Sequence, residues 1–329
     1  MRAADRGSLM AQVLDLKAMP PALGLYAKAL APTRRPSVAA GLPEREVQLL
    51  GHRSTVTEVA AYDRVCGFVL GDELPATWLH VLTFPLQLTL MTAPGFPLAL
   101  AGLVHVSNSM VQVRPALIGE ALDLRVRAEN LRPHRRGVLV DLVGEAAVAG
   151  ETVWQGRSVY LSRQARLAPA PEPGASPVPS GRQEGRGVVG EASRSLSSAN
   201  GSHSVPADDA AGTASAPSLQ MAGLWRLPAD LGRRYAAVSG DVNPIHLSAL
   251  SAKAFGFPRA IAHGMCTHAR VLAALQPRLP QVYEVSVQFI KPVLLPSTVR
   301  LALGESEQGF SAQVTNRAAD RVFLTLSTQ

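Results

Sequence analysis

Two segments of the chain resemble each other and occur in the same order, and this internal repeat restricts the possible folds more than any other feature. The motif YxxVCG at residues 62–67 matches YxxVSG at residues 235–240. Residues 111–126 then match residues 287–303 at nearly the same offset. A repeat of this kind indicates two copies of one structural unit. We therefore expect a chain built from two related halves.

The elements predicted for each half follow an α+β order. In the second half, a helix is predicted at Gly264–Leu275, because Met265, Ala269, Leu272 and Leu275 recur at helical spacing. The first half has an apolar segment of helical length at 79–91. Further elements of the second half are strands at 224–227, 282–290, 298–303, 310–316 and 322–327, helices at 228–238 and 247–255, and a turn at 239–245. This order predicts a long helix packed in a curved antiparallel sheet in each half.

A change in composition separates the two halves. The chain from residue 163 to about residue 218 is rich in Ala, Pro, Gly, Ser and Arg and has few large apolar side chains. Such a segment cannot bury enough apolar surface to offset the entropy lost on ordering. We predict an N-terminal extension at 1–45, a first domain at 46–163, a disordered linker at 164–218 and a second domain at 219–329.

The basic character of the chain limits its partners. The net charge is +7, with arginines clustered at residues 34–35 and 132–136. No basic stripe interleaved with aromatic residues, zinc-finger spacing or helix-turn-helix pattern occurs in the sequence, so we expect no nucleic acid partner. Either a solvated basic surface or an anionic partner, such as a phosphate-bearing coenzyme or an acidic carrier protein, explains the charge.

Two further features concern location. Residues 74–113 contain no charged side chain, but Pro85, Pro94 and Pro97 interrupt them, so we interpret this stretch as a buried core and not as a membrane span. The first twenty or so residues have no apolar run typical of a secretory signal. Two cysteines, Cys66 and Cys266, make no disulfide framework. We expect a cytoplasmic protein.

The most informative motif is the string YAAVSGDVNPIH at residues 235–246, followed by AFGFPRAIAHGMCTHARVL at 254–272. Together these blocks resemble the MaoC-like dehydratase family and its (R)-specific enoyl-CoA hydratases, also called hydratase 2. The resemblance covers most of residues 224–329 and, more faintly, 62–162. It implies the hot-dog fold, in which an antiparallel sheet wraps a central helix. The two related halves then imply a double hot-dog protein.

The resemblance also implies that Asp241 and His246 act on the catalytic water. Hydration of an enoyl thioester needs a base for water and an acid for Cα, and these two residue types suit both tasks. We take Asp241 as the general base and His246 as a donor, although which residue moves which proton stays open. Pro244 biases Asn243 away from the αR region, which predicts a rigid corner. In the alternative interpretation, these side chains only bind turn and cap backbone.

The third task is to stabilise the thioester oxygen. Gly264 begins the predicted helix after His263, and a helix N-terminus offers unpaired N–H groups. The Gly264 N–H is therefore the candidate oxyanion donor, unless the glycine merely permits a tight junction. We expect Asn243, Ser239, Tyr235 and His263 to bind substrate or line the site, although core packing explains Tyr235 and Ser239 equally well.

We expect no metal and no redox cofactor. His263, Cys266 and His268 are close in sequence, but their spacing fits no zinc pattern and further ligands are missing. Cys266 is better explained as a small buried helix residue than as a nucleophile.

The first half departs from the motif. Its counterpart reads CGFVLGDE, with Phe68 where Asp241 stands, so this copy is expected to be catalytically degenerate. The charge-free residues 74–104 suit either ordinary core packing or a tunnel for the acyl chain. If they form a tunnel, a bulky substitution such as Ala93→Trp should shorten the preferred chain.

The sequence thus predicts a lyase that reversibly hydrates trans-2-enoyl thioesters to (R)-3-hydroxyacyl thioesters in fatty-acid metabolism. The alternatives are an acyl-thioester hydrolase of the same fold and a non-catalytic acyl-thioester-binding protein. The substrate carrier is either CoA or an acyl carrier protein. The protein is expected to be a monomer with an internal pseudo-dimer, or a homodimer.

Overall fold

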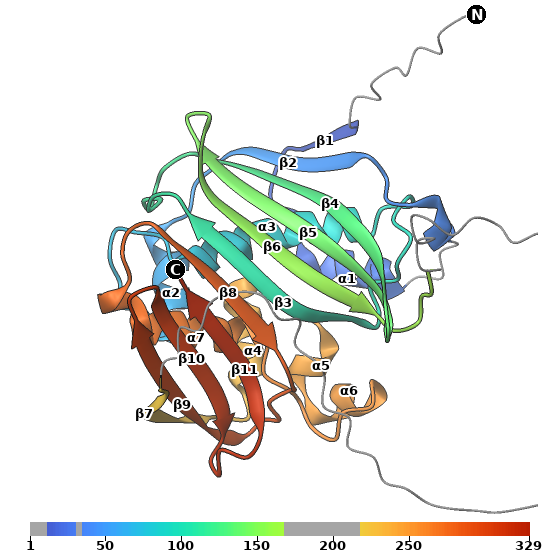
Figure 1. Ribbon diagram of the computed structural model, residues 1–329. Helices are drawn as coiled ribbons and strands as arrows, with labels where there is room; N and C mark the ends of the chain where they lie inside the picture. The colour runs from blue at the N-terminus through green and yellow to red at the C-terminus, as the bar shows by residue number, and fades with distance from the viewer. Residues whose placement is uncertain (1–11, 31–34, 168–217) are drawn as a thin grey trace, which may run out of the picture. The chain divides into compact units, whose positions relative to one another are not determined.

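The computed structural model describes residues 12–30, 35–167 and 218–329, and both halves belong to one unit (Figure 1). The linker predicted at 164–218 lies almost entirely outside these residues. Residues 1–11 and 31–34 of the predicted N-terminal extension lie outside them as well.

The described strands form one sheet that runs through both halves. Its order is β1-β2-β4-β5-β6-β3-β8-β11-β10-β9-β7. Neighbouring strands are antiparallel, apart from the parallel pair β1 and β2. The strands are β1 (Gln12–Leu16), β2 (Arg45–His52), β3 (Leu103–Gln112), β4 (Leu122–His134), β5 (Gly137–Val148), β6 (Glu151–Ser162), β7 (Gln220–Leu227), β8 (Tyr283–Phe289), β9 (Ser297–Ser306), β10 (Gly309–Asn316) and β11 (Val322–Thr328).

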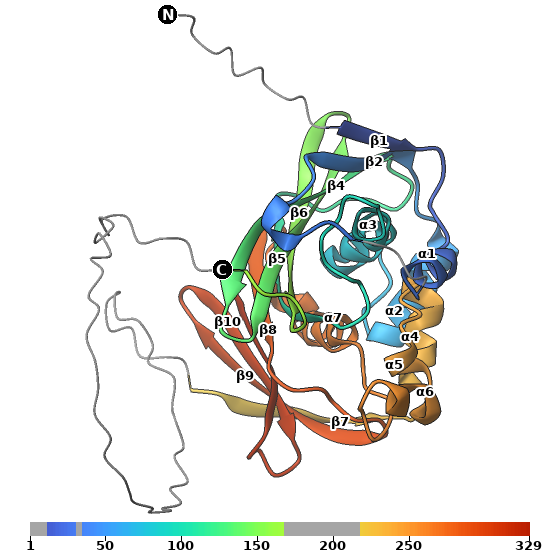
Figure 2. The ribbon, with the colours of Figure 1, turned by 90° about the vertical axis from the view of Figure 1, so that its right-hand side faces the viewer.

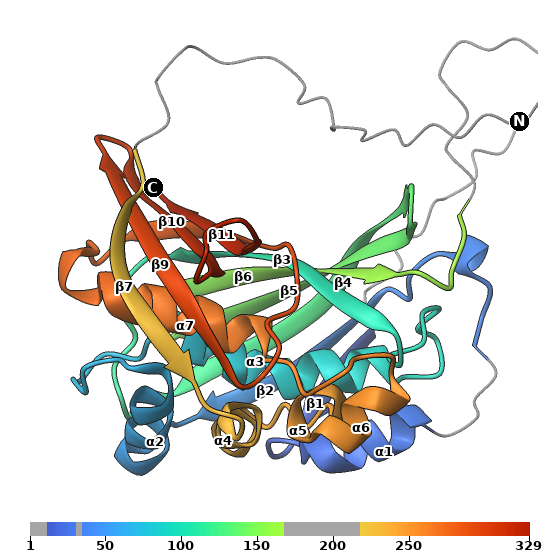
Figure 3. The same ribbon diagram turned by 90° about the horizontal axis from the view of Figure 1, so that it is seen from below.

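The helices lie on one side of this sheet. They are α1 (Ala22–Leu30), α2 (Val56–Cys66), α3 (Ala76–Met91), α4 (Leu231–Ser239), α5 (Pro244–Leu247), α6 (Ala249–Ala254) and α7 (Gly264–Leu275), with single 3-10 turns at Val38–Ala40 and Gln276–Arg278. Figures 2 and 3 show α3 and α7 between the sheet and the shorter helices. The predicted strands and helices of the second half are present, including the helix at Gly264–Leu275, but the turn predicted at 239–245 is shorter, because α4 extends to Ser239 and α5 begins at Pro244.

The two halves repeat the same arrangement. The strand order β2-β4-β5-β6-β3 corresponds to β7-β9-β10-β11-β8, and helices α2 and α3 correspond to α4 and α7. The equivalent strands β3 and β8 pair antiparallel, with Met110 opposite Val285, as an internal twofold requires. The rings of Tyr62 and Tyr235, which the sequence repeat aligns, lie 6.2 Å apart. The predicted α+β double hot-dog is thereby confirmed.

The central helices explain the unusual composition of residues 74–113. Every residue of α3 is buried except Thr89, and a helix that is apolar nearly all round is a buried one. In α7, the residues predicted to form one apolar face, Met265, Ala269, Leu272 and Leu275, are all buried. No helix in the described part of the chain is long and apolar enough to cross a membrane.

Residues 12–30 and 35–45 of the N-terminal segment are part of the folded unit. Strand β1 extends the sheet beside β2, and α1 packs near α3. Leu25 of α1 packs against the core, and Ala22 is buried. The extension predicted at 1–45 therefore includes a strand and a helix that belong to the same unit as the two hot dogs.

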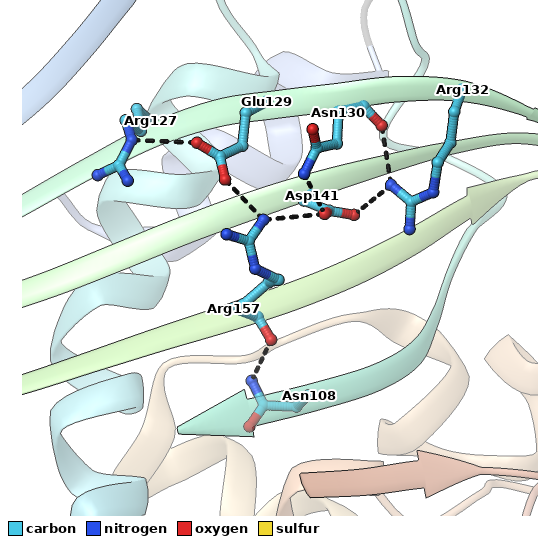
Figure 4. A network of polar contacts seen from close by, with 7 residues as sticks. All are labelled: Asn108, Arg127, Glu129, Asn130, Arg132, Asp141 and Arg157. Atoms are coloured by element: carbon cyan, nitrogen blue, oxygen red, sulfur yellow. Dashed lines mark hydrogen bonds and ion pairs between the residues drawn. The ribbon is translucent and has the colours of Figure 1, made fainter. Parts of the chain in front are cut away.

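One arginine of the cluster at 132–136 is held in a polar network on the outer face of the sheet (Figure 4). Asp141 is the centre of this network, and its side chain is only 4% exposed. Arg132 and Arg157 contact its two oxygens at 2.7 and 2.9 Å, and Asn130 donates to it at 3.0 Å. Asn130 has a positive φ of 53° in the bulge of β4. The network therefore fixes this bulge.

Candidate active site

The candidate site is built on the turn between α4 and α5. Gly240 ends α4 in the left-handed region with φ 71°, and its N–H donates to the Ala236 carbonyl at 3.0 Å. Asn243 has φ −55° and ψ 124°, the extended conformation predicted from the following proline. Its side chain accepts from the Ile245 N–H at 3.4 Å, which caps α5. The corner therefore holds residues 241–243 between two helix ends.

Asp241 is tied to this turn and to a distant helix. Its Oδ1 accepts from the Asn243 N–H at 3.2 Å and from the Tyr26 hydroxyl at 2.6 Å. Its own N–H donates to Ser239 Oγ at 3.2 Å. The side chain keeps 24% exposure, and Oδ2 lies 3.7 Å from His263 Nε2. One carboxylate oxygen is thus held by two donors, and the other is the freer acceptor.

The ionisation of Asp241 follows from its neighbours. Burial raises the pKa of this carboxyl, but His263 and His246 and the hydrogen bonds from Tyr26 and Asn243 lower the pKa by more. The pKa of Asp241 therefore lies below its ordinary value, and the group is a carboxylate at neutral pH.

His246 is oriented by a carbonyl. Its Nδ1 lies 2.8 Å from the Ile261 oxygen, and because a carbonyl only accepts, Nδ1 carries the proton. Burial, followed by the adjacent His263, lowers the pKa of His246 to about 3. The imidazole is therefore neutral near pH 7, with Nε2 as a hydrogen-bond acceptor. The donor role predicted for His246 from sequence stays a prediction, because in this tautomer Nε2 would first have to take a proton from the water.

His263 supports the other two residues. Its ring stacks on that of His246 with centroids 3.7 Å apart. Its Nε2 lies 2.9 Å from the Asp241 carbonyl, to which it donates. Tyr235, which is 2% exposed, packs against the His263 ring at 4.8 Å. In the described structure, His263 thus holds the main chain of Asp241.

Gly264 is the first residue of α7, and its N–H has no hydrogen-bond partner among the described residues. A Cβ at this position would lie 2.9 Å from Cδ1 of Phe289, too close for any real side chain. The structure therefore supplies a packing reason for the glycine, alongside the substrate approach inferred from sequence. The two reasons are compatible, because the unpaired N–H and the missing Cβ are different groups.

All seven residues predicted for the site line one cavity of about 1030 Å³; they are Tyr235, Ser239, Asp241, Asn243, His246, His263 and Gly264. The cavity extends into the first half, where Phe84 and Leu88 of α3 and Leu103 of β3 line it. Ala93, chosen from sequence as a tunnel residue, does not line it. A pocket of only about 100 Å³ lies beside Phe68, the counterpart of Asp241 in the first half.

Some residues that line the cavity lie outside the sequence motif and were not predicted. Tyr26 and Leu23 of α1 line the cavity, as do His80, His105 and Tyr160 of the first half. Burial lowers the pKa of His80 to about 4 and that of His105 to about 3. These imidazoles are therefore neutral near pH 7.

Within the described part of the chain, the residues placed so that they could hold a metal ion are Asp241, His246 and His263. One ligand atom from each lies within 4.8 Å of the others. One nitrogen of each histidine is already engaged by a carbonyl. Cys266 and His268, weighed from sequence as ligands, are not part of this group.

The fold and cavity define the class of protein: a double hot-dog with one carboxylate–imidazole site. A family model described as MaoC like domain matches residues 215–322. The chain is 37% identical over 289 residues to 3-hydroxyacyl-thioester dehydratase X of Mycobacterium tuberculosis, which covers 88% of this chain and 90% of that protein. The chain belongs to the MaoC-like dehydratase family.

Solved structures are similar to this chain in fold as well. The crystal structure of HtdX from Mycobacterium tuberculosis has a TM-score of 0.67 and 35% sequence identity, covering 86% of this chain and 99% of that one. A second protein of that organism, described as having a double hot-dog fold, has a TM-score of 0.51 and 14% identity over 84% of this chain and 92% of its own. The second likeness concerns the fold alone.

Proposed function

We propose that the protein interconverts 3-hydroxyacyl thioesters and trans-2-enoyl thioesters, by dehydration in one direction and hydration in the other. The observation that carries this proposal is that Asp241 and His246 lie side by side in the wall of one cavity. Asp241 and His246 each offer an atom within 4.8 Å of the other's. One water can bridge two acceptors at that spacing, because each hydrogen bond spans about 2.8 Å.

Asp241 and His246 would share the proton transfers. In hydration, the bridging water loses a proton to one of them while its oxygen forms the bond to Cβ. That proton can then return to Cα, so that no net proton is consumed. The neutral His246, with Nε2 as acceptor, is at least as good a candidate for the base as Asp241. Asp241 would then stabilise the imidazolium.

Gly264 and the cavity would bind the rest of the substrate. The N–H at the start of α7 would donate to the thioester oxygen and stabilise the developing enolate. The acyl chain would lie between α3 and β3, in the half that lacks the catalytic aspartate. Arg136, Arg163 and Lys291 also line the cavity and would attract the phosphates of CoA or an acyl carrier protein.

A reducing, cytoplasmic setting is part of the proposal, and the two buried, free cysteines fit it. Each chain would carry one active site, because the equivalent position in the other half is Phe68. The internal pseudo-dimer would allow a monomer to be active.

The experiment is incubation with crotonyl-CoA, followed by longer enoyl-CoAs up to C16. Loss of enoyl absorbance without release of free thiol is the expected result, whereas release of thiol would indicate hydrolysis. Asp241→Ala and His246→Ala should each lower kcat by at least about a hundredfold. Asp72→Ala, which removes an exposed carboxylate from the other half, is the matched control and should be unchanged. Wild-type rates in both site variants would refute the assignment.

A further inference from the structure

Tyr26 makes a hydrogen bond to the candidate catalytic aspartate that no part of the family motif accounts for. Its hydroxyl donates to Asp241 Oδ1 at 2.6 Å, across 215 positions of sequence. This is shorter than the 3.2 Å bond from the Asn243 N–H to the same oxygen. A phenol bound to a carboxylate at this distance makes a strong, charge-assisted hydrogen bond.

The phenol is a permanent donor. Burial, then the neighbouring Asp241, raise the pKa of Tyr26 well above its ordinary value. The hydroxyl therefore keeps its proton throughout the pH range of any assay. Unlike a water molecule, it is fixed by a folded helix, so the bond does not have to be re-formed in each catalytic cycle.

The helix that carries Tyr26 is itself docked at the catalytic turn. A Cβ on Gly240, the residue before Asp241, would lie 3.6 Å from Cβ of Ala22. Ala22 is buried, and Leu25 packs against the core. Leu23 and Tyr26 form part of the cavity wall. Helix α1 thus closes one side of the site and brings its hydroxyl to a defined point.

We propose that Tyr26 is a positioning residue of the reaction: it holds Oδ1 of Asp241 so that Oδ2 faces the water. This inference rests on the proposed function. Without the phenol, only the Asn243 N–H restrains the carboxylate among the described residues. The Asp241 carboxylate could then rotate, and its pKa would rise because a donor to its charged form is missing. Tyr26 remains outside the proton transfers, because it does not exchange its own proton.

Several titratable groups surround Asp241 and bear on the pH dependence of kcat. The titratable groups that influence Asp241 from neighbouring elements are Tyr26 on α1, His80 on α3, His105 on β3, Tyr160 on β6, Tyr235 on α4, His246 on α5 and His263 before α7. Burial lowers the pKa of all four histidines and raises that of all three tyrosines. The pKa of Asp241 lies below its ordinary value, and the pKa values of His80, His105 and His246 lie at about 4, 3 and 3, so the position of an acidic limb does not by itself identify Asp241. The shift caused by removing the Tyr26 hydroxyl does identify it, because that hydroxyl donates to Asp241.

The test is Tyr26→Phe, which removes one oxygen and keeps the ring. We expect kcat for crotonyl-CoA to fall about tenfold, with KM changed less than about twofold, because the bond restrains the carboxylate and not the substrate. The acidic limb of the kcat profile should move up by about one pH unit, because a donor to the charged form has been lost. Lys28→Ala, on the exposed side of α1, is the matched control and should match the wild type.

Leu25→Ala separates the hydroxyl from the docking of the helix. It should loosen α1 and raise KM, with a smaller shift of the acidic limb than Tyr26→Phe gives, because the phenol is still present. Wild-type kcat and an unmoved limb in Tyr26→Phe would overturn the proposal. A rise in kcat would also overturn it, because the phenol would then be competing with water for Asp241. If the wild type itself fails to hydrate any enoyl-CoA, the proposed function fails instead, and that result is read before the variants are compared.

Discussion

Gly264→Ala is the perturbation whose effect follows most directly from measured contacts. The added Cβ would lie 2.9, 3.0 and 3.2 Å from three atoms of the Phe289 ring. Carbon atoms in favourable contact are about 3.5–4.0 Å apart, so the ring or the start of α7 must move by roughly 0.5–1 Å. The ring packs edge-on against His105 with centroids 5.0 Å apart, so moving it also disturbs this contact.

The expected cost follows from this overpacking. Inserting a methyl group into a packed site costs about 1–3 kcal/mol, which for a chain of this size lowers Tm by about 2–4 °C per kcal/mol. A displaced N–H also loses part of the stabilisation that one oxyanion donor gives, so kcat should fall about 10- to 100-fold. Differential scanning calorimetry and steady-state hydration of crotonyl-CoA measure the two effects separately.

Phe289→Leu supplies the companion variant. In the double variant Gly264→Ala/Phe289→Leu, the smaller side chain on β8 makes room for the methyl group added at the start of α7. Added to Phe289→Leu, Gly264→Ala should therefore lower Tm and kcat much less than it does in the wild type. If Gly264→Ala lowers Tm and leaves kcat unchanged, the N–H at this position takes no part in catalysis. If it changes neither quantity, the packing argument is wrong as well.

Three further predictions concern stability, acid sensitivity and chain length. Asp141→Ala leaves Arg132 and Arg157 without their buried partner. The free energy of unfolding in urea should therefore fall by about 1–3 kcal/mol, with kcat preserved at low temperature. No change in the unfolding midpoint would show that the network does not contribute to stability. Burial lowers the pKa of His268 from 6.5 to about 3, so the unfolded chain takes up a proton at this side chain at a higher pH than the folded chain does. This group should therefore lower the free energy of unfolding by up to about 1.4 kcal/mol per pH unit as the pH drops below about 6.5. His268→Leu should weaken that pH dependence in urea titrations at pH 7 and pH 5, and an equally steep loss would show that His268 does not contribute to it. Leu103→Trp should narrow the cavity and shift the preferred enoyl-CoA to shorter chains, whereas Val111→Trp, on the same strand but outside the cavity, should not; identical profiles would exclude Leu103 from the acyl site.

The fold was largely predictable because local and global signals agree in this sequence. The spacing of Met265, Ala269, Leu272 and Leu275 defines one helix face, and the structure buries all four. Pro244 restricts the residue before it, and the predicted corner at Asn243 is present. The internal repeat supplied what local patterns lack, namely that the two halves are equivalent and form a double hot-dog.

The site was less predictable, because its geometry depends on distant contacts. Nothing local marks Tyr26, which reaches Asp241 only because α1 folds back across 215 positions. The tautomer of His246 is set by the Ile261 carbonyl, which reaches Nδ1 across the site. Ala93 was a poor choice of tunnel residue because it lies just beyond the end of α3, and a charge-free, apolar composition does not reveal which side chains face a cavity.

The placement of Asp241 in one copy and Phe68 in the other bears on how such a chain can evolve. In a dimer of identical single hot dogs, both subunits carry every substitution. A change that widens the acyl site therefore also alters the surroundings of the catalytic turn in each subunit. A tandem chain removes that constraint. Mutations in α3 could adapt the cavity to a new acyl chain while the turn at Asp241 stays as it is. Substrate preference and catalysis could then change independently during evolution.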